Sequence, residues 1–82
     1  MLKDKIIVFV HVATIGNYQE VINEIFESLI KTNLINTADS INVCVVGEGE
    51  LNIPINRNLK IIQTPDINIG EFYTLKQIEK YS

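Results

Sequence analysis

The chain has 82 residues, a net charge of −3 and an apolar fraction of 46%. This length supports one domain, and the apolar fraction is typical of a folded globular protein rather than a disordered one. Seven Lys and Arg residues are spread along the chain, so the sequence predicts no basic patch of the kind that binds nucleic acid. The longest apolar run, Ile6–Val10, is far too short for a membrane-spanning helix, which argues against a membrane partner.

The cysteine and histidine counts and the first residues bear on location and metal binding. The single cysteine, Cys44, excludes a disulfide within the chain and fits a reducing compartment. One cysteine and one histidine are too few for a structural zinc site within one chain. Met1–Lys5 leads into a strand-like stretch without a small-residue cleavage site, so we expect no signal peptide and a cytoplasmic location.

The best-defined part of the chain is a strand, a short polar loop and a helix. Lys5–Val12 is almost continuously apolar and rich in β-branched residues, which predicts a strand buried on both faces of a parallel sheet. Asn17 is expected to cap a helix that continues to about Lys31, its side chain accepting from the amide of Gln19 or Glu20. The residues expected on the buried side of this helix have helical spacing: Tyr18, Val21, Ile22, Ile25, Phe26, Leu29 and Ile30.

Two further strands are predicted. Ile41–Val46 is a continuous strand-like run, and Leu59–Thr64 alternates enough to be a strand nearer the sheet edge. A strand, a helix and a second strand predict a right-handed unit with parallel strands. Between the second and third strands, Gly47–Asn58 is expected to be a surface connection with a turn of helix near Glu50.

A last helix is predicted to begin near Thr74. Thr74 and Gln77 have the spacing of a capping box, and Tyr73 and Ile78 have that of a hydrophobic staple. The helix has a well-defined start and no C-cap before Ser82. We therefore expect residues 1–82 to be a single α/β domain that is truncated within its last helix.

The predicted fold class is a small, mainly parallel three-stranded α/β sheet, a Rossmann-like half with the order β-α-β-β-α. One full helix is available to cover the sheet, and the last helix is short. Because part of one sheet face then lacks cover, we expect the chain to form a homo-oligomer.

Candidate binding residues lie where the strands end. Ligands of open parallel sheets bind outside the carboxyl ends of the strands, here at 11–17, 47–50 and 64–68. The amide-rich helix start after Asn17 is of the kind that holds a phosphate, but Glu20, Glu48 and Glu50 place negative charge nearby and these loops contain no Lys or Arg, which argues against anion binding here. Gly47 and Gly49 match half of a dinucleotide-binding fingerprint, but Asn52 occupies the place of its third glycine, so a turn is the preferred interpretation.

Other chemistry-bearing residues have simple structural interpretations beside the functional ones. His11 is either a general base or ligand, or a hydrogen-bonded structural residue. Cys44, in mid-strand, is expected to be an unreactive core thiol. Asp66 and Asn68 supply a single carboxylate, which is a poor site for a divalent metal. From the residues alone we predict no catalytic residue, no metal ligand and no cofactor.

The chain resembles the start of glycosyltransferase-like proteins of bacteria and large viruses. The resemblance lies in the strand ending at His11, the loop to Asn17 and Tyr18, the amphipathic helix and Thr32–Ile35 at its end. The second strand running into Gly47 and the segment Phe72–Leu75 opening a helix are similar too. The resemblance covers nearly the whole chain. It implies the first half of a nucleotide-sugar-binding α/β domain.

This resemblance implies a nucleotide beside the strand-end loops. The ligand-binding residues expected on this basis are His11, Ala13, Thr14, Asn17, Gly47 and Asp66. A nucleotide sugar with a divalent metal is the implied ligand. The family's metal-binding carboxylates and acceptor site come later than this chain extends, and no Asp-x-Asp motif is present. The resemblance therefore implies binding without catalysis.

Two functions remain open at this point. One is a glycosyltransferase-like domain that binds a nucleotide or sugar nucleotide without turning it over. The alternative is a non-catalytic, self-associating protein-interaction module. A pocket with converging amides and His11 at the strand ends would favour the first, and packing of these loops into a subunit interface would favour the second.

Overall fold

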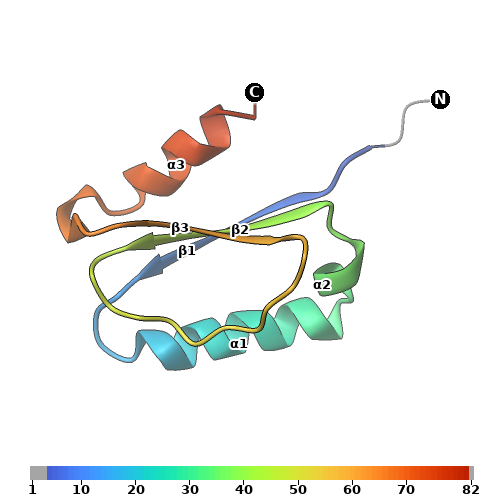
Figure 1. The fold of residues 1–82 in the computed structure, drawn as a ribbon, viewed down its shortest axis with the longest axis horizontal. Coiled ribbons are helices and arrows are strands. Elements are labelled where there is room, and N and C mark those ends of the chain that lie inside the picture. Colours follow the sequence, from blue (N-terminus) through green and yellow to red (C-terminus); the bar gives the residue numbers. More distant parts are fainter. Residues whose placement is uncertain (1–3, 82) are drawn as a thin grey trace.

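The computed structural model describes residues 4–81 and contains a three-stranded parallel sheet. Its strands are β1 (Ile7–Ala13), β2 (Ser40–Val46) and β3 (Leu59–Thr64), arranged in the order β1-β2-β3. The sheet forms the middle layer in Figure 1, with α1 (Tyr18–Lys31) on one face and α3 (Phe72–Glu79) on the other. This arrangement confirms the predicted α/β class and the order of its main elements.

Two short helices were not predicted. α2 (Leu34–Thr37) follows α1 directly, and η1 (Ile67–Ile69) lies between β3 and α3. Asn33 separates α1 from α2 with a φ of 62°, a left-handed conformation that Asn adopts more readily than most residues. The expected helical turn near Glu50 is wrong, because residues 49–56 have no regular structure.

The core lies between α1 and the sheet, and β2 is its centre. Residues 41–46 of β2 are all buried, whereas most of β1 is half-buried. The expectation that the first strand is covered on both faces is therefore wrong. Within residues 4–81 no strand pairs with the outer edge of β1. The main core residues are Val10, Val12, Ile22, Phe26, Leu29, Ala38, Ile41, Val43 and Val45.

The buried side of α1 is narrower than its apolar pattern predicted. Ile22, Phe26 and Leu29 are buried, as expected. Val21 and Ile30, however, are 52% and 59% exposed. A helix on a flat sheet contacts it along one stripe, so apolar residues at the margins of that stripe remain accessible to solvent.

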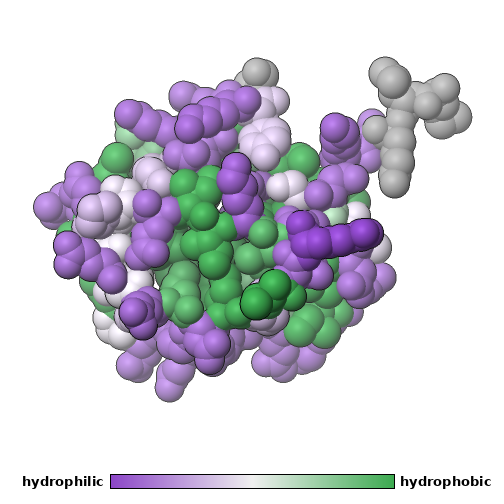
Figure 2. Space-filling model, in the orientation of Figure 1, coloured by the Kyte–Doolittle hydropathy of each residue, from purple (hydrophilic) through white to green (hydrophobic). Residues whose placement is uncertain are grey.

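The connection between β2 and β3 runs on the same side of the sheet as α1. The connections β1 to β2 and β2 to β3 each lead to the next strand in the same direction across the sheet. If both connections are right-handed, as is usual between parallel strands, they must lie on the same face. The Tyr18 hydroxyl donates to the carbonyl of Glu50 at 3.0 Å, which fixes the loop beside the helix. Because a loop stands here in place of a helix, Ile55 and Ile61 are exposed. Figure 2, which looks onto the β3 edge of the sheet, shows apolar surface in the middle of the view, around β3 and this loop.

α3 covers part of the opposite face of the sheet. It begins at Phe72, two residues before the predicted start, and its N-cap, Glu71, makes no side-chain capping bond. The predicted capping box is wrong because Thr74 and Gln77 lie inside the helix and are buried. None of the helices formed by residues 4–81 has both the length and the apolarity to cross a membrane.

Candidate functional site

The loops that follow the three strands meet at one edge of the sheet. The Thr14 amide donates to the Val46 carbonyl at 2.9 Å, and the Gly47 amide donates to the Thr64 carbonyl at 2.8 Å. Ala13 ends β1, and Asp66 follows β3 by two residues. This edge is therefore the one at which open parallel sheets bind their ligands.

Thr14 and Tyr18 fill the space between the first two of these loops. The Thr14 hydroxyl accepts from the Gly49 amide at 3.2 Å and donates to the Val46 carbonyl at 3.4 Å. A Cβ at Gly47 would overlap Thr14 Oγ1, and a Cβ at Gly49 would lie 2.7 Å from both Thr14 Cβ and the Tyr18 hydroxyl. The two glycines therefore serve the packing of a turn, which agrees with the preferred interpretation of their spacing.

The start of α1 is open to solvent. Asn17 occupies the N-cap position, but its side chain makes no capping hydrogen bond, so this part of the prediction is wrong. Its ψ of 46° is not the extended value usual at an N-cap. Gly16 precedes it with a φ of +56°, and a Cβ at Gly16 would have nothing within 4 Å. The Glu20 amide already donates to the Asn17 carbonyl at 3.0 Å, so the first-turn amides left to an anion are those of Tyr18 and Gln19.

The charge around this helix start is negative. Glu20 lies in the first turn of α1, and Glu48 and Glu50 are exposed in the neighbouring loop. Residues 11–17, 47–50 and 64–68 contain no Lys or Arg. A phosphate at this edge would therefore meet helix amides on one side and carboxylates nearby, and these carboxylates would repel it.

His11 has a structural role on the α3 face of the sheet. Its Nδ1 lies 2.7 Å from the Thr74 hydroxyl, so the ring fastens α3 to β1. Cys44 is the register partner of His11 on β2, so the two side chains lie on the same face of the sheet. Burial raises the pKa of the Cys44 thiol, and the side chain of Thr74 acts in the opposite direction. The thiol is fully buried, which confirms the interpretation of Cys44 as a core residue.

Asp66 lies at the carboxyl edge, as expected, but is used locally. Its Oδ1 accepts from the Asn68 amide at 3.1 Å and caps η1. The next residue, Ile67, reaches back to Gly47, since a Cβ there would lie 3.0 Å from Ile67 Cδ1. In the described part of the chain, no group of three or more His, Cys, Asp or Glu residues is arranged to hold a metal ion.

A cavity that the sequence did not predict lies on the α3 face. Its volume is about 240 Å³. It lies toward the amino ends of the strands, away from the strand-end loops, because Phe9, Asn42 and Lys60 belong to the first half of their strands. The end of α3 helps to enclose it. The signal in the sequence was Asn42, a polar residue inside an apolar strand. The residues that line the cavity are Phe9, Asn42, Lys60, Ile62, Gln77, Lys80 and Tyr81.

Comparisons with protein-family models, with curated proteins and with solved structures gave no significant match to this chain. The class that the geometry defines is a small parallel α/β domain. Its strand-end loops meet beside an uncapped helix start.

Proposed function

We propose that the chain is a glycosyltransferase-like α/β domain that binds a nucleotide or sugar nucleotide at the carboxyl edge of its sheet. The observation that supports this best is the start of α1, which follows β1 directly and lacks a side-chain cap. Helix amides in this position are a common binding place for phosphate. The proposal also rests on the family resemblance of the sequence, which implies a nucleotide at the same loops.

In this proposal the domain binds its ligand without turning it over. His11 is engaged by Thr74 on the far side of β1, and Cys44 is buried beneath α3. Neither is therefore available to act as a base or nucleophile at the strand-end loops. Asp66, the carboxylate at this edge that follows β3, is engaged in capping η1. Because Glu20, Glu48 and Glu50 surround the edge, we expect binding to be weak and to require Mg²⁺ or Mn²⁺.

A thermal-shift titration tests this binding. UDP, GDP and their sugar conjugates, each with Mn²⁺ or Mg²⁺, are expected to raise the melting temperature as ligand is added. Ligand at 100 times its Kd would add about 2.7 kcal/mol to the free energy of unfolding. Asn17→Asp should abolish this shift, because its carboxylate adds a negative charge beside the first-turn amides and repels phosphate, while the same charge interacts favourably with the helix dipole.

Asn23→Asp is the matched control. It makes the same change of charge on an exposed residue of α1 outside the first turn, and it should leave the ligand-induced shift intact. No shift with millimolar ligand, or equal shifts in the two variants, would contradict the proposed site.

The outer edge of β1 favours a second function, a self-associating interaction module. The Thr14 amide and the Ile6 carbonyl bond to the β2 side. Since backbone groups alternate along a strand, those of Ile7, Phe9 and His11 point toward the open edge. Strand β1 contains no Pro, Gly, Lys or carboxylate, which are the residues that usually protect such an edge. We propose that two copies pair antiparallel through β1 and form one continuous six-stranded sheet.

Light scattering with two proline variants tests this assembly. The native mass is expected to be about twice that of the 9.3-kDa chain. Ile7→Pro removes an outward amide of β1 and should give a monomer, because proline cannot donate to an added strand. Ile61→Pro makes the same change at the outer edge of β3 and should remain dimeric. A monomeric native chain, or loss of the dimer in Ile61→Pro alone, would contradict pairing through β1.

A further inference from the structure

The cavity on the α3 face is lined by the three strands of the sheet and, on one side, by the end of α3. Its floor includes one row of residues across the three strands, in which Phe9 lies opposite Asn42 and Asn42 lies opposite Lys60. Lys80 and Tyr81, at the end of α3, form the wall. The rings of Phe9 and Tyr81 meet edge to face, with centroids 5.5 Å apart. The cavity is therefore built from four elements of the fold.

The charge of this cavity is opposite to that of the whole chain. Two lysines, Lys60 and Lys80, line it, and no carboxylate does, although the chain carries a net charge of −3. Among residues 4–81, the salt bridge formed is between Glu27 and Lys31, and neither cavity lysine has a carboxylate within 4.0 Å. Two ammonium groups that form no ion pair within residues 4–81 lie beside a partly enclosed space, which favours an anionic ligand.

The other residues that line the cavity indicate which kind of molecule would carry the negative charge. Phe9 and Tyr81 offer aromatic surface and Ile62 offers aliphatic surface, while Gln77 supplies a side-chain amide. Gln77 is only 9% exposed and Asn42 only 1% exposed. The Asn42 side-chain nitrogen donates to the Val8 carbonyl and the Ser40 hydroxyl, which holds this side chain in place. A volume of about 240 Å³ is below the range of drug-sized sites and fits a single ring with one substituent.

We propose that this cavity binds a small aromatic anion, a single ring carrying a carboxylate or phosphate group. The anionic group lies between the ammonium groups of Lys60 and Lys80, and the ring packs against Phe9 and Tyr81. This site is separate from the proposed nucleotide site, because it lies on the α3 face toward the amino ends of the strands. Neither proposal depends on the other.

NMR titration of the full chain with benzoate and with phenyl phosphate tests the proposal. Backbone amide signals of Phe9, Asn42 and Lys60 should move in a saturable way with at least one of the two probes. Lys60→Gln and Lys80→Gln should each weaken binding about tenfold, which is typical of losing one charge-assisted hydrogen bond. The first probe to saturate identifies the anionic group as carboxylate or phosphate.

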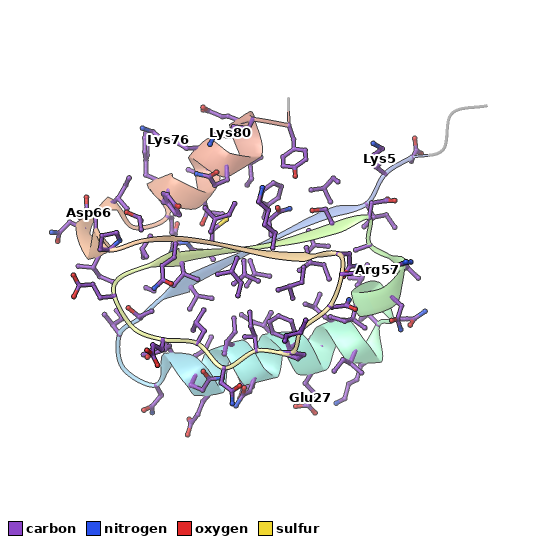
Figure 3. All side chains as sticks on the ribbon, viewed as in Figure 1. Lys5, Glu27, Arg57, Asp66, Lys76 and Lys80 are labelled. Carbon is purple, nitrogen blue, oxygen red and sulfur yellow. The ribbon has the colours of Figure 1, made fainter. Side chains whose placement is uncertain are left out.

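Lys76→Gln is the matched control on the same helix. Figure 3 shows both Lys76 and Lys80 on α3, with Lys76 extending away from the sheet, and its amine lies 5.5 Å from the Phe72 ring centroid. This variant should bind the probe as the native chain does. Benzyl alcohol and benzylamine, which have the ring without the negative charge, should give no saturable shift. Equal binding of these probes, equal weakening by Lys76→Gln, or no saturable shift with either anion would overturn the proposal.

Discussion

Gly47→Ala is expected to destabilise the fold by about 2–5 kcal/mol, because it combines backbone strain with a steric clash. Gly47 has a φ of +110°, a conformation that residues with a side chain rarely adopt. A Cβ at this position would also overlap Thr14 Oγ1 and lie 3.0 Å from Ile67 Cδ1. Urea unfolding followed by circular dichroism measures the loss.

Gly70→Ala separates the two contributions. Gly70 also has a positive φ, +56°, but a Cβ there has nothing within 4 Å. Its ψ of −144° lies outside the left-handed helical region, so the substitution should cost only the backbone term, about 1–3 kcal/mol. Adding Thr14→Ala to Gly47→Ala should recover part of the larger loss, since it removes the overlapping hydroxyl. If Gly47→Ala costs no more than Gly70→Ala, the loops do not pack as described.

Ile22→Ala is expected to cost about 2–5 kcal/mol, because it leaves a cavity in the centre of the core. Ile22 is 0% exposed and belongs to the cluster between α1 and the sheet. A domain of this size has a total stability of about 4–12 kcal/mol. The variant should therefore show a large fall in the urea midpoint, with little change in the slope of the transition.

Ile30→Ala is the matched control, since it makes the same change on the same helix. Ile30 is 59% exposed, so its substitution should change the free energy of unfolding by no more than about 0.5 kcal/mol. A cost equal to that of Ile22→Ala would mean that this side of α1 is covered by another chain in solution. That result would support self-association through α1 rather than through β1.

The sequence was sufficient for the elements whose local and tertiary preferences agree. The bounds of β3 are those predicted, and α1 begins and ends where its periodicity places it. Parallel order followed from the strand-helix-strand pattern. The meeting of Thr14, Gly47 and Asp66 at one edge then follows from parallel order alone, because the carboxyl ends of parallel strands share an edge.

The wrong predictions concern residues whose local sequence pattern is compatible with more than one set of contacts. Thr74 fits a capping box, but its hydroxyl instead bonds to His11, 63 positions away in the chain. Asn17 has the residue type of an N-cap, while its backbone conformation prevents the capping bond. A run of apolar residues in β1 does not say which strand lies beside it. Each of these outcomes depends on tertiary neighbours that no local pattern specifies.

The cavity on the α3 face could not be predicted from the sequence, for the same reason. Phe9, Asn42 and Lys60 become neighbours only through the register of the three strands. Lys80 and Tyr81 complete it only because α3 returns across the sheet. The strand-end loops, in contrast, were predictable because their position depends on strand direction and not on register.

The hydrogen bond between His11 and Thr74 holds α3 against the sheet. α3 has eight residues, too few to be stable as an isolated helix, and its buried residues are Thr74 and Gln77. Its detachment should therefore cost less free energy than global unfolding. Since Cys44 lies beneath it, the rate at which a thiol reagent modifies this residue reports transient release of α3 while α1 and the core of the sheet remain folded.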